Sequence, residues 1–322
     1  MYKVYVTHVI PEEGITFLKK KGFEVDVNDG GKKLTPTDLR EVFGRYDAVV
    51  CLVHDKIDEQ VIAAASPKLK VIANYAVGWD NIDVVAAARR GIFVTNTPGV
   101  AGESVAEHTF LLILSVTKKL IEADRFVRSG KFSGWDPNAF LTSQVWGKTI
   151  GIVGLGKIGT YVGHIAYGGF KMRILYHDVW RSEDFEMLTE AKYTSLERLL
   201  KEADIVTLHV PLLPSTKHLI GTKELAMMHE GAILINTSRG PVVDQEALID
   251  ALTRHKIAGA GLDVFEDEHH IPHDLRVLGN TVLTPHIASA TVETRSAMAN
   301  LVAQNIVDVF AGRIPFGLIK VS

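Results

Sequence analysis

The chain lacks several features that mark particular protein classes. Its single cysteine in 322 residues excludes an intramolecular disulfide and a metal cluster built on cysteines. Because Cys51 lies in the apolar run 48–53, we expect a buried thiol in a strand. The charges nearly cancel, with 35 Lys and Arg against 38 Asp and Glu, so no broad basic face is available to bind the phosphates of a nucleic acid.

Long apolar runs and a targeting segment are also missing. No stretch reaches the ~18–20 apolar residues that cross a bilayer, and the first residues lack the charged, apolar and small-residue regions of a signal peptide. Low-complexity segments and Gly/Ser linkers are absent as well. We therefore expect a soluble, cytoplasmic protein that binds neither membranes nor nucleic acid.

The chain is long enough for two packed cores, since domains usually span ~100–200 residues and 47% of this sequence is hydrophobic. Short β-branched runs alternate with helical patterns in two series. The expected strands are residues 4–6, 23–27, 48–53, 71–73 and 92–95, and then 150–153, 173–176, 205–208, 232–235, 258–262 and 282–283. This alternation predicts an α/β protein with two Rossmann-like parallel-sheet domains and a cleft between them.

Two longer helical patterns, residues 102–129 and 291–311, separate and follow the two series. We expect both helices to cross between the domains, which makes the first domain discontinuous. The predicted division is a flavodoxin-like substrate domain of residues 1–99 plus 291–322, and a nucleotide-binding domain of residues 100–290.

A glycine motif opens the second series. It reads Gly154-Leu155-Gly156-Lys157-Ile158-Gly159, directly after a strand and at the start of a helix, as a dinucleotide-binding fingerprint requires. The glycines allow a tight turn, an approach of backbone N–H groups to the pyrophosphate, and close helix packing. Asp178 lies 19 residues beyond the motif, where a carboxylate binds the adenosine ribose hydroxyls and repels a 2′-phosphate. We therefore expect NAD rather than NADP, although nearby Arg181 softens that preference.

Three polar residues each follow an expected strand of the second series. Arg239 comes after the strand 232–235, Glu268 comes in the segment after 258–262, and His286 comes after 282–283. Because ligands of open α/β sheets bind at the carboxyl ends of the strands, we expect these side chains to share one site.

The three residue types match the chemistry of keto acid reduction. The planar guanidinium of Arg239 can bind a carboxylate and polarise a carbonyl. Hydride transfer to the carbonyl leaves an alkoxide, to which His286 can donate a proton, and Glu268 would favour the imidazolium. Each residue by itself also has a non-catalytic explanation. Arg239 fits a surface ion pair and Glu268 a solvated acid, and His286 is one of 13 histidines. Their occurrence together beside a nucleotide motif favours catalysis.

Further motifs extend over nearly the whole chain. They are residues 74–83 (NYAVGWDNID), 97–99 (TPG), 105–107 (VAE), the glycine motif, 209–212 (HVPL), 236–240 (NTSRG), 261–266 (GLDVFE) and 284–287 (TPHI). With them the chain resembles the D-isomer-specific 2-hydroxyacid dehydrogenases, which implies that Arg239, Glu268 and His286 are catalytic and that the product is a D-2-hydroxy acid.

The resemblance also implies binding residues. The amides of Val77 and Gly78 should hold the substrate carboxylate, together with Arg239. The residues expected at the cofactor, besides the glycine motif and Asp178, are His209, Val210, Pro211, Thr216, Thr237, Ser238, Asp263 and His286. A homodimer is expected, with the 102–129 helix in the contact.

Three segments narrow the resemblance. Residues 126–130 (FVRSG), 135–137 (WDP) and 172–176 (MRILY) look like the archaeal glyoxylate and hydroxypyruvate reductases, so glyoxylate or hydroxypyruvate is the favoured substrate. Other 2-keto acids stay open, as in D-lactate or 3-phosphoglycerate dehydrogenases. A non-catalytic NADH-sensing protein, similar to the corepressors that resemble this family, stays open too.

The chain also departs from its relatives in places. The segment after Glu268 often ends in proline, but here it carries His269, His270 and His273 in a polar loop, where we do not expect a metal. Formate dehydrogenases resemble the pattern but place glutamine where Glu268 stands. Phosphite dehydrogenases carry a lysine where Val77 stands, so neither fits.

Overall fold

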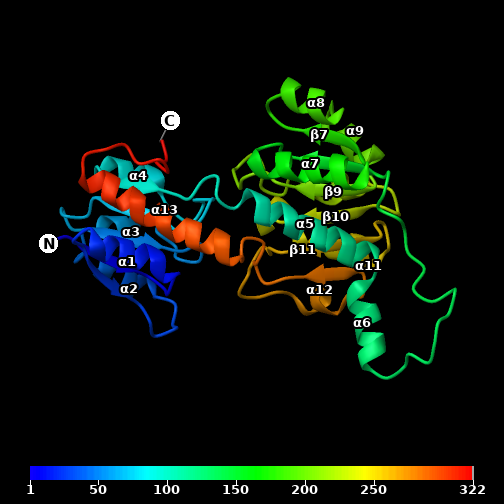
Figure 1. Ribbon diagram of the computed structural model, residues 1–322, viewed down its shortest axis with the longest axis horizontal. Coiled ribbons are helices and arrows are strands. Elements are labelled where there is room, and N and C mark those ends of the chain that lie inside the picture. The colour runs from blue at the N-terminus through cyan, green and yellow to red at the C-terminus, as the bar shows by residue number, and fades with distance from the viewer. Residues whose placement is uncertain (321–322) are drawn as a thin grey trace. The chain divides into compact units, whose positions relative to one another are not determined.

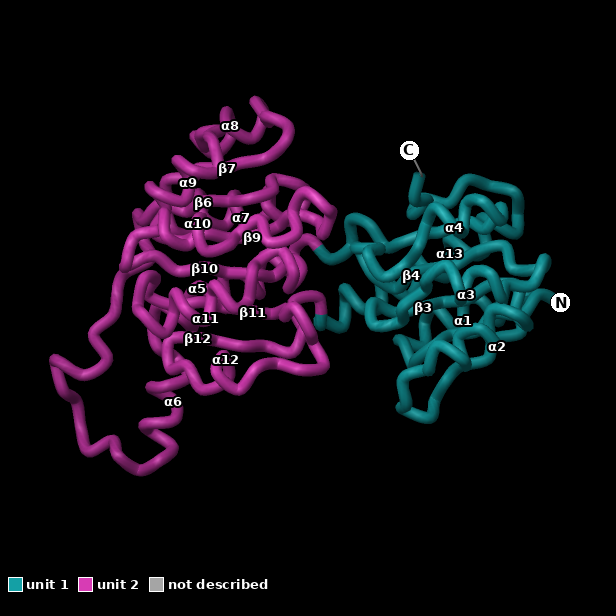
Figure 2. The backbone as a smooth tube through the Cα atoms, turned by 180° about the vertical axis from the view of Figure 1, so that it is seen from behind, with its two compact units in different colours: residues 1–101, 290–322 teal, residues 102–289 magenta. Residues whose placement is uncertain are grey.

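The computed structural model describes residues 1–320, which separate into two compact units (Figure 2). Unit 1 comprises Met1–Ala101 and the segment from Ala290 onward, and unit 2 comprises Gly102–Ser289. The chain passes between the units just before each of its two longest helices, so each helix belongs wholly to one unit. The expectation that these helices themselves cross between domains is therefore wrong.

Unit 1 contains a five-stranded parallel sheet (Figure 1). Its strands are β1 Lys3–Val6, β2 Glu24–Val27, β3 Ala48–Cys51, β4 Val71–Asn74 and β5 Phe93–Thr95. The spatial order is β2-β1-β3-β4-β5, which is the flavodoxin-like order of a doubly wound sheet.

Helices cover both faces of this sheet. They are α1 Glu12–Lys20, α2 Pro36–Phe43, α3 Glu59–Ala63, α4 Val84–Arg89 and α13 Val292–Phe310. Ala48 and Val50 of β3 face the core under α1 and α13, whereas Val49 and Cys51 face the core under α2, α3 and α4. This alternation follows from the two-residue period of a strand, and it buries the Cys51 thiol as expected.

Unit 2 contains a seven-stranded parallel sheet. Its strands are β6 Thr149–Val153, β7 Arg173–His177, β8 Lys192–Tyr193, β9 Ile205–Leu208, β10 Ile233–Asn236, β11 Gly259–Leu262 and β12 Thr281–Leu283. Their order is β12-β11-β10-β9-β6-β7-β8, so the strand order reverses between β6 and β9. This is the Rossmann arrangement, in which a dinucleotide binds at the reversal point. The α/β prediction with two parallel sheets is confirmed.

The helices of unit 2 also form two layers. They are α5 Gly102–Thr117, α6 Leu120–Arg128, α7 Lys157–Phe170, α8 Glu183–Thr189, α9 Leu196–Glu202, α10 Thr222–Leu225, α11 Gln245–Thr253 and α12 His273–Val277, with the short 3-10 helix η1 Gly240–Val242. Helices α5, α7 and α8 pack on one face, and α9 to α12 pack on the other. Among residues 1–320, no helix combines the length and apolarity that crossing a membrane requires.

The expected helix 102–129 is two helices. Lys119 adopts a left-handed backbone conformation, with φ of 51°, between α5 and α6. That conformation cannot continue a right-handed helix, so the chain changes direction there. The sequence analysis also missed β8, because two residues at a sheet edge leave no periodic pattern.

A histidine with buried ring nitrogens follows β9. His209 as a residue is partly exposed, but both of its ring nitrogens are shielded from solvent and have no hydrogen-bond partner within residues 1–320. Burial lowers the pKa of His209 to about 3. The imidazole is therefore neutral in the folded protein at ordinary pH.

This burial predicts a specific pH dependence of stability. The pKa of His209 is lower in the folded chain than the 6.5 of an unperturbed histidine, so the unfolded chain binds the extra proton. The free energy of unfolding should therefore fall as the pH drops from about 6.5 towards about 4. Urea unfolding across this range should show a shallower slope for His209→Gln. His273→Gln, whose imidazole is 73% exposed, should keep the parent slope, and an equal slope in all three proteins would contradict this account.

Candidate active site

The glycine motif forms the turn between β6 and α7. Gly154 has φ of +91°, and a Cβ there would lie 2.8 Å from the backbone of His209 and Val210. A Cβ at Gly159 would lie 2.3 Å from the carbonyl oxygen of Gly154, so this glycine lets α7 pack closely on the turn. A Cβ at Gly156 would meet nothing within 4 Å. The space beside Gly156, at the N-terminus of the 14-residue helix α7, is therefore free of other protein atoms.

Asp178 follows β7 and contacts the glycine motif directly. One carboxylate oxygen accepts a hydrogen bond from the Leu155 amide at 2.6 Å, and the other accepts one from the Trp180 amide at 3.2 Å. Each oxygen keeps a second lone pair that can accept a further hydrogen bond. The carboxylate is thus fixed at the carboxyl edge of the sheet, next to the turn.

Arg181, the residue that softened the expected preference for NAD, pairs with another acid. Its guanidinium donates to both oxygens of Glu186, at 2.9 and 2.7 Å. These hydrogen bonds, together with one from Tyr176, lower the pKa of Glu186 to about 2. The bidentate contact uses the Nε/Nη2 edge of the guanidinium and pairs its charge with a carboxylate.

Several of the expected cofactor residues use their side chains within the protein. The Thr216 hydroxyl donates to the Pro211 carbonyl at 2.6 Å, and the Thr237 hydroxyl lies 3.1 Å from that of Thr109 on α5. The Ser238 hydroxyl donates to the Asn236 side chain at 2.8 Å. All three hydroxyls therefore already take part in hydrogen bonds within the protein.

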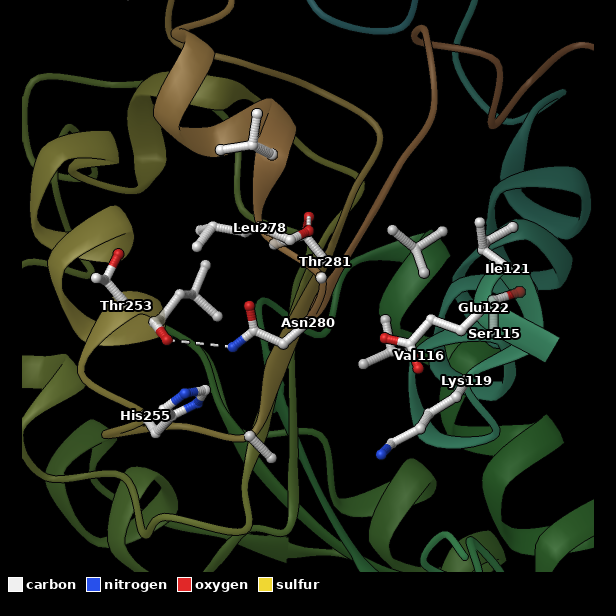
Figure 3. A pocket seen from close by; sticks show the side chains of 15 residues that line it. Ser115, Val116, Lys119, Ile121, Glu122, Thr253, His255, Leu278, Asn280 and Thr281 are labelled. Atoms are coloured by element: carbon white, nitrogen blue, oxygen red, sulfur yellow. Dashed lines mark hydrogen bonds between the residues drawn. The ribbon is translucent and has the colours of Figure 1, made fainter. Parts of the chain in front are cut away.

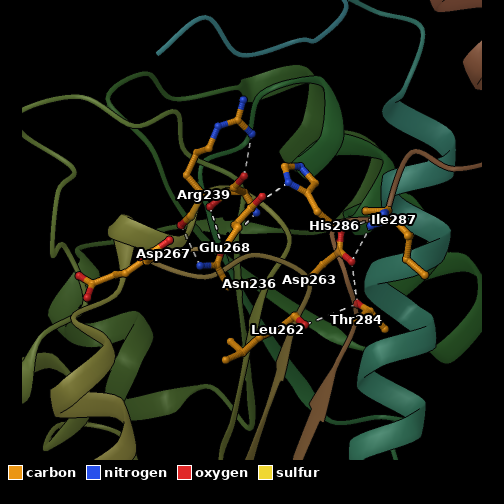
Figure 4. Close-up of polar contacts among 12 residues, drawn as sticks. Asn236, Arg239, Leu262, Asp263, Asp267, Glu268, Thr284, His286 and Ile287 are labelled. Atoms are coloured by element: carbon orange, nitrogen blue, oxygen red, sulfur yellow. Dashed lines mark hydrogen bonds and ion pairs between the residues drawn. The ribbon is translucent and has the colours of Figure 1, made fainter. Parts of the chain in front are cut away.

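The expected catalytic residues gather at the carboxyl ends of β10, β11 and β12 (Figure 4). His286 Nδ1 lies 2.8 Å from a Glu268 carboxylate oxygen, and the two side chains are 30% and 40% exposed. The Arg239 guanidinium lies at the same edge and donates to the Ser238 carbonyl at 2.9 Å. With Nδ1 engaged by Glu268, Nε2 is the nitrogen of His286 that can serve a reacting group.

The loop that carries His286 is held by Asp263, which is fully buried at the end of β11. The Asp263 carboxylate accepts hydrogen bonds from the Thr284 hydroxyl at 2.6 Å and from the amides of Ile287 and Ala288 at 2.9 and 2.8 Å. Its backbone carbonyl accepts the His286 amide at 2.9 Å, and His286 has a left-handed φ of 55°. Asp263 therefore sets the position of the imidazole.

His108, which the sequence analysis did not single out, completes this network. It lies on α5 and is only 8% exposed. Its Nε2 lies 3.0 Å from the Thr284 hydroxyl and 3.4 Å from the Asp263 carboxylate. Burial alone would raise the pKa of Asp263, but the hydrogen bonds from His108, Thr284 and the two amides outweigh it and hold the pKa below its usual range. No sequence motif connects a helical histidine with a residue 155 positions later.

The loop that carries Glu268 packs directly on Gly240. A Cβ at Gly240 would lie 1.8 Å from the Phe265 carbonyl oxygen, so only glycine fits beside this loop. The His218 ring contacts the Glu266 carboxylate, and the Glu266 amide lies 3.4 Å from the Gln245 side chain. The backbone next to Arg239 therefore packs directly against the loop that carries Glu268.

Val77 and Gly78, the expected substrate residues, follow β4 in unit 1, whereas the other predicted site residues belong to unit 2. His269 and His273 lie on the surface with acid neighbours at 3.6 and 3.7 Å. Within residues 1–320, no three His, Cys, Asp or Glu side chains are grouped so that they could hold a metal ion.

A hollow of about 560 Å³ in unit 2 lies away from these residues (Figure 3). It is lined by α5, α6 and the amino ends of β11 and β12, including Val116, Glu122 and Thr281. The chemistry-bearing side chains follow the carboxyl ends of the same strands, so this hollow is not the candidate active site.

Comparison with known proteins identifies the family. Residues 110–288 match the D-isomer specific 2-hydroxyacid dehydrogenase, NAD binding domain. The chain is 49% identical to the glyoxylate reductase of Korarchaeum cryptofilum, over 99% of this chain and 96% of that one.

Two solved structures are similar over the same length. The D-lactate dehydrogenase from Aquifex aeolicus, complexed with NAD and lactic acid, is 31% identical with a TM-score of 0.86, covering 99% of this chain and 100% of that one. The NADPH-dependent glyoxylate/hydroxypyruvate reductase from Sinorhizobium meliloti, in complex with NADP and malonate, is 31% identical with a TM-score of 0.87, covering 99% and 96%. The chain belongs to the D-isomer specific 2-hydroxyacid dehydrogenases and is an oxidoreductase of that family.

Proposed function

We propose that this enzyme reduces glyoxylate or hydroxypyruvate to the D-2-hydroxy acid with NADH. The observation that carries the proposal is the His286–Glu268 pair at 2.8 Å beside Arg239, at the same sheet edge as the glycine motif. A proton donor, its carboxylate partner and a carboxylate-binding cation are the groups that this reduction requires. The similarity to glyoxylate reductases supports the choice of substrate.

The residues around the glycine motif fit a dinucleotide. The open space at Gly156 and the N-terminus of α7 suit the pyrophosphate, and Asp178 has free lone pairs for the ribose hydroxyls. NADH, when bound, supplies the hydride. The backbone of His209 and Val210 lies next to Gly154, and these residues, with Pro211, Thr216, Thr237 and Ser238, would contact the cofactor.

NAD is the favoured cofactor because of the charges beside the ribose. Asp178 repels a 2′-phosphate, and the positive charge of nearby Arg181 is paired with Glu186. The similar structures include complexes with NAD and with NADP, so the local charges carry this choice.

The protein's own groups then perform three tasks. The Arg239 guanidinium and the amides of Val77 and Gly78 bind the substrate carboxylate and orient the keto group. His286 Nε2 donates a proton to the keto oxygen as negative charge develops there. The Glu268 carboxylate contacts Nδ1 of His286 and keeps the ring oriented so that Nε2 faces the substrate.

A homodimer is part of the proposal. Helix α6 and residues 129–148, which contain no helix or strand and in large part extend away from the sheet in Figure 1, expose many apolar side chains. These are Leu120, Ile121, Val127, Phe132, Trp135, Phe140, Leu141 and Trp146. Since such a patch is typical of protein interfaces, the intact chain should sediment at twice the mass of one chain.

The decisive test of the function is NADH oxidation followed by absorbance. Glyoxylate and hydroxypyruvate should give higher kcat/KM than pyruvate, phenylpyruvate, 2-ketoglutarate or 3-phosphohydroxypyruvate, and NADPH should be the poorer donor. A preference for pyruvate or for the phosphorylated acid would move the assignment to a D-lactate or 3-phosphoglycerate dehydrogenase. Tight NADH binding without turnover of any acid would favour the sensor.

Arg239→Ala separates substrate binding from cofactor binding. The variant should lower kcat/KM at least about 100-fold, since hydrogen bonds to charged groups contribute about 1.5–3 kcal/mol each. NADH binding, measured by fluorescence, should stay unchanged. Arg254→Ala, which removes an exposed arginine paired with Asp250, is the matched control. Loss of NADH binding in Arg239→Ala would count against the assignment.

His286→Asn and Glu268→Gln test the proton donor and its partner. Loss of a general acid typically lowers kcat by about 10²–10⁴-fold, so His286→Asn should do so while NADH binding persists. Glu268→Gln should lower kcat by a smaller factor, because the amide oxygen can still accept a hydrogen bond from Nδ1 but lacks the charge of the carboxylate. His273→Asn, on the exposed start of α12, should behave as the parent enzyme. Near-normal turnover by His286→Asn would remove it as the acid.

A further inference from the structure

Three successive carbonyls in the loop after β4 are each held by a different donor. The Ala76 carbonyl accepts the Thr97 amide at 2.8 Å, the Val77 carbonyl accepts the Asn96 side-chain amide at 2.6 Å, and the Gly78 carbonyl accepts the Asn74 side-chain amide at 2.8 Å. Asn74 ends β4, and Asn96 and Thr97 follow the neighbouring strand β5. The carbonyl groups of these three consecutive loop residues are therefore all hydrogen-bonded within unit 1.

These contacts fix the direction of two N–H groups. In a trans peptide the N–H points opposite to the carbonyl of the same plane, and residues 1–320 contain no cis peptide. Holding the Ala76 carbonyl therefore directs the Val77 N–H away from Thr97, and holding the Val77 carbonyl directs the Gly78 N–H away from Asn96. Neither N–H donates a hydrogen bond to another described residue, and Val77 is 37% exposed.

We propose that Asn96 is a positioning residue for substrate binding, which aims the Gly78 N–H at the substrate carboxylate by holding the Val77 carbonyl. Asn74 supports the same loop one carbonyl further on. This inference rests on the proposed function, in which the Val77 and Gly78 amides bind that carboxylate. Asn96 itself does not touch the substrate.

The clamp is itself rigidly held by unit 1. The Asn96 amide donates to the Gly317 carbonyl at 2.9 Å, and the Asn96 carbonyl accepts the Asn305 side chain at 3.0 Å. Asn305 lies fully buried on α13 and also accepts the Gly317 amide at 3.2 Å. Because these bonds form on folding, the loop is ordered before the substrate arrives, which lowers the entropy cost of binding.

Asn74 is braced in the same way on the other side of the loop. Asn74 is fully buried. Its side-chain nitrogen donates to the Asn81 side chain at 3.1 Å, and its side-chain oxygen accepts from the Cys51 thiol at 3.4 Å. Asn81 in turn donates to the Leu52 and Asp55 carbonyls at 3.0 and 3.1 Å. The ends of β3, β4 and β5 thus hold one loop in a single conformation.

The test is the kinetics of Asn96→Ala and Asn96→Asp with NADH and the best keto acid. In both variants KM for the keto acid and Ki of the unreactive carboxylate oxamate should rise about 10-fold, as expected for loss of one buried hydrogen bond. The changes in kcat and in NADH affinity should be much smaller. Asn28→Ala, which removes bonds to the Thr7 and Lys32 carbonyls at 3.0 and 2.9 Å, is the matched control and should keep the parent KM.

Asn96→Asp adds a readout that a merely structural role would not move. A protonated aspartate can donate to the Val77 carbonyl, whereas the ionised form repels it, so KM relative to the parent should improve as the pH falls. Asn96→Asp keeps the size of the side chain and carries the test if Asn96→Ala does not fold. Unchanged KM and Ki in a folded variant would overturn the inference while leaving the function intact. A parent enzyme that reduces no keto acid would instead refute the function.

Discussion

The structure of the site depends on one buried carboxylate. Asp263 follows β11 and has no exposed surface. Its carboxylate accepts hydrogen bonds from the Thr284 hydroxyl and from the amides of Ile287 and Ala288, so the turn after β12 folds around it. A buried charge is tolerated only when hydrogen bonds replace its water, and here they do so by ordering the segment that presents His286. The hydrogen bonds that stabilise the buried Asp263 carboxylate therefore also fix the turn that carries His286, the proposed proton donor.

The same design recurs at other strand ends. Asp178 receives the Leu155 amide and so ties β7 to the glycine turn, while Asn74 and Asn96 tie the ends of β4 and β5 to the Val77 loop. In each case a polar side chain at a carboxyl end satisfies backbone groups that the sheet leaves unpaired. Parallel strands bring these ends to one edge, so the loops become ordered where ligands of such sheets bind.

Glycines decide how closely these loops approach. Gly159 lets α7 contact the Gly154 carbonyl, and Gly240 lets the Arg239 segment lie against Phe265, where any Cβ would overlap the backbone. The second contact joins the segment with the guanidinium to the segment with Glu268. Close backbone packing at Gly240 therefore fixes how the segments of the two candidate catalytic residues, Arg239 and Glu268, lie against each other.

Local periodicity was enough to predict the parallel α/β architecture, because strands buried on both faces are β-branched and the helices between them are amphipathic. The glycine motif and Asp178 directly follow strands, and the three candidate catalytic residues lie in loops that follow strands, so the sequence itself indicated the edge of the sheet to which they belong. The break at Lys119 and the short edge strand β8 were not, because a single left-handed residue and a two-residue pairing leave no periodic trace. By contrast, only the tertiary structure shows that His108 contacts Asp263 and that Asn96 donates a hydrogen bond to the Val77 carbonyl. His108 lies 155 residues before Asp263, and Asn96 lies 19 after Val77, and only the packing of α5 and of β5 on their sheets brings them within hydrogen-bond distance.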